Sequence, residues 1–221
     1  MENFSQNQGI DALEKLERML YNWVRAHYEI SEKREAKIES RLKHLKEVKE
    51  ISLELLEKLN SADEKNKKVL IGASYLHDIE KFKDDEKHPL LGSIFVRAYE
   101  AEILQMGFEK EEVAELCELI LFHNQGFYKI GLEGNLIESE ENKHRSILIH
   151  ILQDADKISK IYKGKGDMYM LPWRALKDDD VYKAAKQRNM AIHITKKGLN
   201  TEVAYKTFEE RFNQYIKGLI D

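Results

Sequence analysis

The sequence has few of the residues that cross-link or interrupt a fold. Its 221 residues include a single cysteine, Cys117, and two prolines, Pro89 and Pro172. One cysteine excludes an internal disulfide and any zinc site built from cysteines alone, and it fits a reducing compartment. Two prolines leave room for long, unbroken helices. A chain of this length can bury a hydrophobic core that needs no cross-link to support it.

Long apolar runs and an excess of one charge are missing as well. No stretch approaches the ~20 apolar residues of a membrane-spanning helix, and the charged N-terminus has no apolar segment of signal-peptide length. We therefore expect a cytoplasmic protein that does not enter a membrane. The 36 Lys and Arg residues against 40 Asp and Glu give a formal net charge of -4. This balance argues against non-specific binding to nucleic acid, although a local basic pocket is compatible with it.

Apolar residues recur at spacings of three and four along most of the chain, whereas two-residue alternation is rare. This pattern predicts an all-α fold in which strands are minor. Pro89 stands where a helix can begin, because the first turn does not need its missing N–H. The expected helices cover about residues 10–28, 38–59, 67–79, 89–104, 110–122, 144–162, 180–189 and 201–220. Residues 126–142 and 163–173 are expected to be irregular.

Several imidazole and carboxylate groups fall on, or at the end of, the apolar stripes of these helices. They are His44, His77, His123 and Asp156. Helical bundles build metal sites by projecting such side chains inward from several helices, and this ligand pair suits Fe, Mn, Co, Ni or Zn. Asp78, next to His77, could bridge two metals. Each residue taken alone could instead be an ordinary hydrogen-bonded core residue.

Taken in chain order, these residues resemble the HD superfamily of metal-dependent phosphohydrolases, whose pattern is a lone His, a His-Asp pair, two further His in some branches, and an Asp. The segments that carry the resemblance are RLKHLKEV, ASYLHDIEK, HPLLG, ILFHN and QDADK. LHDIEK is similar to the LHDxxK core of the family, and HPLLG to the HPxxG element of its two-metal branches. The resemblance covers about residues 38–162.

The resemblance implies one all-α domain over residues 1–221, an HD-domain helical bundle with its core at about 38–162 and a C-terminal helical extension at 163–221. It also implies one or two divalent metal ions, which could be Mn, Fe, Mg, Ni, Co or Zn. The residues implied as metal ligands are His44, His77, Asp78 and Asp156 for one ion, and His88 and His123 for a second, with Asp78 bridging. Asp154 is the alternative to Asp156. Because the two side chains point about 200° apart on a helix, we expect Asp154 to orient a neighbour instead.

The implied function is hydrolysis of a phosphoester bond, in a nucleotide or a related small phosphate, by metal-activated water. Asp78 and Lys81 are the expected catalytic residues, and Lys81 matches the family lysine that faces the substrate phosphate. Lys163 and Lys165 are further candidates for phosphate binding. For all three lysines, a plain solvated side chain is the alternative. Glu80 departs from the glycine that the family commonly has at this position.

Two other functions remain open from the same ligand set. Some HD proteins use two irons for oxidative C–C or C–P cleavage, and a helical binding or regulatory protein could keep a vestigial site. His123 is not followed by the GYP motif of the cyclic-dinucleotide branch, which argues against that substrate. The other histidines match no motif and are expected to be ordinary residues. They are His27, His144, His150 and His193.

Overall fold

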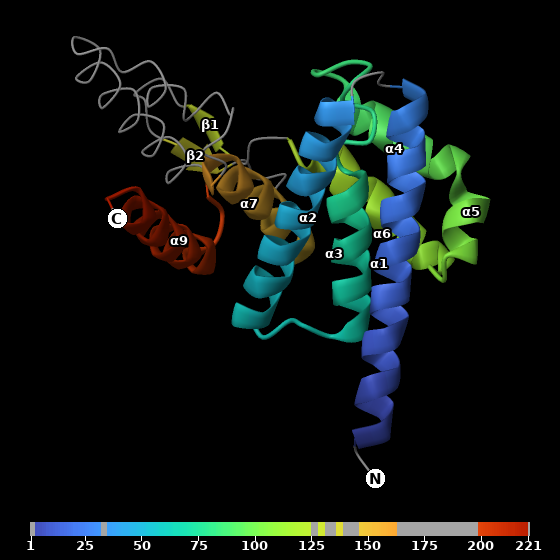
Figure 1. The fold of residues 1–221 in the computed structure, drawn as a ribbon, viewed down its shortest axis with the longest axis horizontal. Coiled ribbons are helices and arrows are strands. Elements are labelled where there is room, and N and C mark those ends of the chain that lie inside the picture. The colour runs from blue at the N-terminus through green and yellow to red at the C-terminus, as the bar shows by residue number, and fades with distance from the viewer. Residues whose placement is uncertain are drawn as a thin grey trace. The chain divides into compact units, whose positions relative to one another are not determined.

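The computed structural model describes residues 3–31, 35–124, 128–130, 136–138, 146–162 and 199–220 (Figure 1). The chain divides into two units, Met1–Gln125 and Gly126–Asp221. The first unit holds α1 (Asn3–Ser31), α2 (Glu35–Lys58), α3 (Glu64–Leu76), α4 (His88–Ala98), α5 (Glu100–Gln105) and α6 (Lys110–Phe122). The second holds β1 (Tyr128–Ile130), β2 (Leu136–Glu138), α7 (Ile147–Tyr162) and α9 (Glu202–Ile220). The predicted all-α fold is confirmed, since each strand has only 3 residues.

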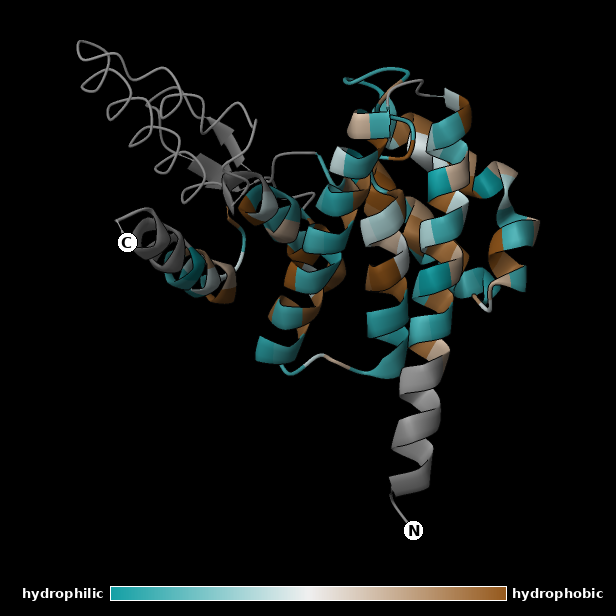
Figure 2. Ribbon diagram, in the orientation of Figure 1, coloured by the Kyte–Doolittle hydropathy of each residue, from teal (hydrophilic) through white to brown (hydrophobic). Residues whose placement is uncertain are grey.

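Helices α1, α2 and α3 of the first unit lie side by side (Figure 1). Figure 2 shows hydrophobic residues mainly on the surfaces that face neighbouring helices and hydrophilic residues on the outer sides, as the spacing of three and four predicts. Every residue of α3 from Val69 to Leu76 is buried. Helix α3 also contacts α1, α2 and α6, so it occupies a central place among the helices of the first unit.

A glycine lets α3 and α6 approach each other closely. A Cβ added at Gly72 would lie 2.8 Å from Phe108 Cζ and 2.9 Å from Leu116 Cδ2, closer than side chains normally pack. Helix α6 begins with a capping box between Glu109 and Glu112 and covers the predicted residues. Because α3 and α6 pack this closely, their C-terminal ends are held at fixed positions. These ends carry the predicted ligands His77 and His123.

The segment predicted as one helix over 89–104 consists of two helices. Helix α4 begins at His88 with Pro89 in its first turn, as expected. The helix is interrupted at Tyr99, whose backbone angles are φ -107° and ψ 26°. The ring of Tyr99 packs against Phe95, with 4.6 Å between ring centroids, and against Trp23, at 5.6 Å. The side-chain contacts that hold this break were not visible in the spacing of apolar residues.

The structure corrects the predicted end of the third helix, which was placed at Ile79. Helix α3 ends at Leu76, and residues 77–83 form a run of tight turns. Ile79 N–H donates to Leu76 O at 3.1 Å, and Lys81 N–H donates to Asp78 O at 3.1 Å, both three residues back rather than four. The backbone is thus wound more tightly than an α-helix. Asp78 and Lys81 therefore lie on turns and not on a helix face.

In the second unit, part of the expected loop at 126–142 forms a short antiparallel hairpin. Tyr128 pairs with Glu138, and Ile130 pairs with Leu136. Runs of three residues are too short to produce a clear two-residue alternation, so the sequence did not indicate them. Helices α7 and α9 match two predicted helices closely. Residues 163–173 and 180–189 lie outside the described residues.

No helix in the described part of the chain combines the length and the apolar character needed to cross a bilayer.

Candidate metal centre

The carboxylate of Asp78 stands at the centre of a group of histidines in the first unit. Its Oδ1 atom lies 3.1 Å from His88 Nε2, 3.6 Å from His123 Nε2 and 3.7 Å from His77 Nε2. All four side chains are buried. His77 closes α3, Asp78 lies on the following turns, His88 begins α4 and His123 closes α6. The ends of three helices and the turns that follow α3 thus supply one small polar cluster inside an apolar core.

The backbone fixes the orientation of the three imidazole rings. The Nδ1 atom of each ring lies at hydrogen-bond distance from the carbonyl oxygen of the residue three positions earlier. The pairs are His77 with Ser74 at 2.9 Å, His88 with Asp85 at 2.7 Å and His123 with Ile120 at 2.6 Å. A carbonyl oxygen can only accept, so Nδ1–H is the donor and a neutral ring keeps a lone pair on Nε2. Three Nε2 lone pairs and a carboxylate oxygen therefore point at one another.

Such an arrangement of acceptors is unfavourable unless a cation lies among them. His88 Nε2 and His123 Nε2 are only 3.1 Å apart, although neither atom carries a proton in this tautomer. Ligand atoms at 2.0–2.2 Å from one metal lie about 3 to 4 Å apart, which is the spacing seen here. One ligand atom from each of His77, Asp78 and His123 lies within 4.8 Å of the others. These residues fit a divalent metal.

The second oxygen of Asp78 faces a different set of groups. Asp78 Oδ2 accepts a hydrogen bond from Lys81 Nζ at 2.9 Å and lies 3.7 Å from His44 Nε2. The rings of His44 and His77 are 5.4 Å apart between centroids, so the two histidines stand on adjacent sides of the carboxylate. Asp78 therefore has one oxygen directed at His77, His88 and His123 and the other at His44 and Lys81.

The surroundings of Asp78 keep it ionised. Burial alone would raise the pKa of its carboxyl, but the neighbouring His77, His123 and His88 and the ammonium of Lys81 together hold the pKa well below its usual range. A ligand carboxylate must be deprotonated to bind a metal. Asp78 meets this requirement at neutral pH.

Two residues of α1 support the turns that carry Asp78. The hydroxyl of Tyr28 donates to the backbone carbonyl of Asp78 at 3.3 Å. His27 Nε2 lies 3.2 Å from Oε1 of the buried Glu80, and the other oxygen of Glu80 accepts from Lys83. Burial lowers the pKa of His27, with Glu80 acting in the opposite direction.

Sequence reasoning missed both α1 residues. The one available signal was that Tyr28 follows Leu20 and Val24 on the apolar stripe of the first helix. The partners in the turns lie some fifty positions further along the chain, which a helical pattern cannot reveal.

The structure thus brings five of the six predicted ligands together in the first unit, with Lys81 beside them. The sixth, Asp156, is buried on α7 in the second unit, and its assignment as a ligand stays a prediction. Lys163 and Lys165 lie outside the described residues.

Asp154 has a clear structural task within the second unit. Its Oδ1 accepts from the backbone N–H of Asn200 at 2.7 Å and from Asn200 Nδ2 at 2.9 Å. Its Oδ2 accepts from the N–H and the hydroxyl of Thr201, both at 3.1 Å. Burial raises the pKa of Asp154 to about 7, against the effect of these hydrogen bonds and of Lys157. Asp154 therefore holds the residues that precede α9.

Comparisons with known proteins agree with this fold. The model of the HD domain family matches residues 41–161. The chain is also similar to a protein from an uncultured Thermotogales bacterium, described as a predicted HD superfamily hydrolase, whose crystal structure was determined at 1.45 Å. The TM-score is 0.51 and the identity 18%, over 91% of this chain and 88% of that one, so the likeness concerns the fold. No curated protein matches the sequence.

Proposed function

The chain belongs to the HD domain family, and from this premise we propose that it is a metal-dependent hydrolase of phosphoester bonds. The observation that carries the proposal is the convergence of three imidazole Nε2 atoms on Asp78 Oδ1, at 3.1 to 3.7 Å. A merely structural cluster of histidines would pair donors with acceptors. Here each Nδ1 donor is used by the backbone, and the acceptors are left facing one another.

In this proposal the buried cluster in the first unit holds the metal ions. Asp78, His77, His88 and His123 supply ligand atoms around Oδ1, and His44 approaches from the side of Oδ2. Asp156 is the remaining proposed metal ligand, because it stands at the position of the last Asp in the HD-superfamily pattern. Bound divalent metals lower the pKa of a coordinated water and neutralise the charge that develops on phosphoryl oxygens.

The protein side chains orient this chemistry. The hydrogen bonds from each Nδ1 to a backbone carbonyl fix the rings before any ligand arrives, so binding requires little rearrangement. Asp78, held ionised, can accept a hydrogen bond from the attacking water and so direct the oxygen lone pair at phosphorus. Lys81 neutralises part of the charge on Oδ2, and its partly exposed ammonium can also meet a phosphate oxygen.

The substrate class proposed here is a nucleotide or a related small phosphate. A panel of phosphomonoesters and phosphodiesters, including nucleotides, tests this when it is incubated with the full chain loaded anaerobically with Mn²⁺ or Fe²⁺. We expect release of phosphate or of a nucleotide product without oxygen and loss of turnover after chelation. Turnover that strictly requires O₂ would support an oxygenase instead. Absence of turnover with every metal and substrate would contradict the proposal.

A further inference from the structure

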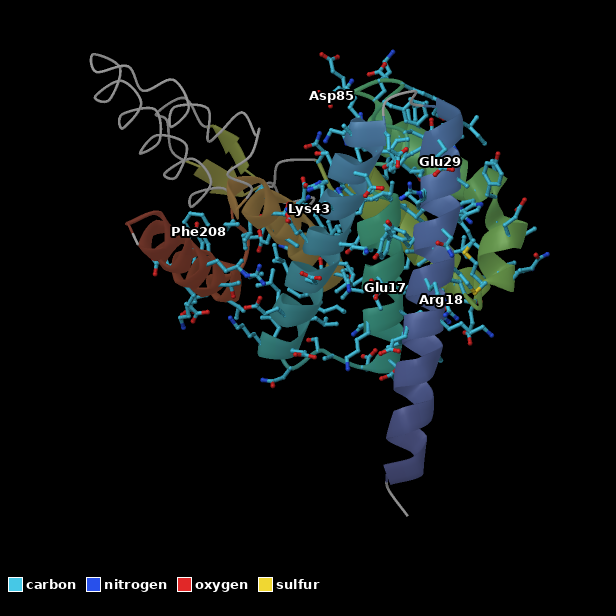
Figure 3. All side chains as sticks on the ribbon, viewed as in Figure 1. Glu17, Arg18, Glu29, Lys43, Asp85 and Phe208 are labelled. Atoms are coloured by element: carbon cyan, nitrogen blue, oxygen red, sulfur yellow. The ribbon has the colours of Figure 1, made fainter. Side chains whose placement is uncertain are left out.

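His27 of α1 contacts two elements that carry predicted metal ligands. Its Nε2 atom lies 3.2 Å from Oε1 of Glu80, on the turns that follow α3. Its ring also packs against Phe95 of α4, the helix that begins with His88, with 4.7 Å between ring centroids. Glu29, two residues beyond His27 on α1, is labelled in Figure 3 and marks this end of the helix. One side chain of α1 therefore meets both the turns and α4.

The carboxylate of Glu80 is buried within the first unit. The residue is only 2% exposed, and its other oxygen pairs with Nζ of Lys83. A buried carboxylate is costly unless it is paired, so Glu80 depends on His27 and Lys83 where they stand. The HD superfamily commonly has a glycine at this position, which has no side chain to make such contacts. The link between the turns and α1 is therefore specific to the sequence of this chain.

Other contacts hold the same turns against α1. The ring of Phe82 lies 5.6 Å from the ring of His27 and 6.4 Å from that of Tyr28, between centroids. The Tyr28 hydroxyl donates to the carbonyl of Asp78. Residues 78–82 thus meet α1 at the backbone of Asp78, the carboxylate of Glu80 and the ring of Phe82. Of these contacts, only that of Glu80 also reaches α4, through the His27 ring.

We propose that His27 and Glu80 are positioning residues of the metal centre. Together they hold the turns of Asp78 in place relative to α4 and so keep Asp78 Oδ1 facing His88 Nε2, at 3.1 Å. This inference rests on the proposed function and adds to it two residues that the sequence pattern did not indicate. Each acts through the ligands whose backbone it holds.

The consequence for metal binding follows from preorganisation. Groups that orient metal ligands typically contribute about ten- to a hundredfold to metal affinity. Glu80 acts on Asp78 through two residues of backbone, so its contribution should lie near the lower end of that range. A pair with a purely structural role would lower the free energy of unfolding. It would leave the metal affinity of the folded protein unchanged.

The test uses His27→Phe, Glu80→Met and the double variant in the full chain. Each single substitution breaks the pair and keeps a side chain of similar volume. Co²⁺ affinity is measured by visible absorption where each metal-free variant is folded, and the free energy of unfolding is measured in urea without metal. We expect each single variant to bind Co²⁺ about tenfold more weakly than the unchanged protein. The double variant should lose no more than this, because the two residues act as one unit.

Glu112 provides the matched control. It is buried like Glu80, at 4% exposed, and pairs with Lys68 at 2.6 Å. It lies in the first turn of α6, whereas His123 closes that helix, so the two are roughly 16 Å apart along the helix at 1.5 Å per residue. Glu112→Met should lower the free energy of unfolding and leave Co²⁺ affinity within about twofold of the unchanged value.

Co²⁺ affinity within about twofold of the unchanged value in either folded single variant would overturn the inference and leave the proposed function intact. An equal loss in Glu112→Met would overturn it too, because affinity would then merely follow stability. A double variant that loses the product of the two single losses would exclude joint action of the pair and so overturn it. If one single variant does not fold without metal, the other decides. If the unchanged protein binds no Co²⁺, the inference and the proposed function both fail.

Discussion

His88 Nε2 and His123 Nε2 lie 3.1 Å apart, although the Nδ1 atom of each ring is held by a backbone carbonyl. Two lone pairs at this distance repel each other unless a proton or a metal lies between the rings. The folded state therefore contains a site whose stability depends on a cation. Unfolding separates these rings, which lie 35 positions apart in the sequence.

Removal of metal should accordingly destabilise the protein. A ligand that binds only the folded state adds about 2.7 kcal/mol at a concentration one hundred times its dissociation constant. We expect a higher midpoint of thermal unfolding with Mn²⁺ or Co²⁺ than with a chelator, and no such difference for Asp78→Ala. Equal midpoints for the unchanged protein under both conditions would contradict this prediction.

Tyr28→Phe should weaken the support of the turns that carry Asp78. The substitution removes the hydrogen bond to the Asp78 carbonyl, and the free energy of unfolding should fall by about 0.5 to 1.5 kcal/mol. Metal affinity should fall too, because Asp78 loses part of its positioning. Tyr75→Phe is the matched control, since it removes a hydroxyl that donates to Glu17 at 2.7 Å. A similar loss of metal affinity in both variants would argue against a role for Tyr28 in positioning.

Asp154→Ala should loosen the start of α9. It leaves the backbone N–H groups of Asn200 and Thr201 without their acceptor, at a cost of about 1 to 3 kcal/mol. Hydrogen exchange of the amides in α9 should become faster, whereas Asp154→Asn should keep part of the protection through its remaining oxygen. Unchanged exchange in Asp154→Ala would show that the contact does not hold the helix.

His27 should make stability depend on pH in the weakly acidic range. Burial lowers the pKa of His27 in the folded state, while Glu80 raises it and Lys83 lowers it. The unfolded chain therefore binds a proton more readily, so the free energy of unfolding falls as pH decreases below the ordinary histidine value of about 6.5. His27→Gln should reduce this slope in urea unfolding measured between pH 5 and 8. The same slope in both proteins would exclude His27 as its source.

The apolar stripes predicted most of the helices and the inward direction of His44 and His123, because both depend on short-range patterns. That these residues and Asp78 belong to one site was implied by the resemblance to the HD superfamily. An apolar stripe shows which face of a helix is buried, and a histidine on that stripe must point inward. The bounds of α6 agree with the prediction for the same reason, since a capping box begins that helix.

Features that depend on contacts between distant residues could not be predicted in this way. Asp78 lies on tight turns rather than on a helix, which follows from backbone hydrogen bonds that side-chain spacing does not encode. The hydroxyl of Tyr28 meets a backbone carbonyl 50 positions away. Asp154 was expected to orient a neighbour, but its partners, Asn200 and Thr201, are 46 and 47 positions away and could not be named.

The most direct test of the metal centre is an equilibrium titration of the full, metal-free chain with Co²⁺, followed by visible absorption. We expect saturable binding with bands typical of nitrogen and oxygen ligands. We also expect at least a hundredfold weaker binding by Asp78→Ala and His123→Ala, because each substitution removes a ligand atom and not only a group that orients one. A metal-free chain that binds no Co²⁺, or an Asp78→Ala variant that binds it as tightly as the unchanged protein, would contradict the account.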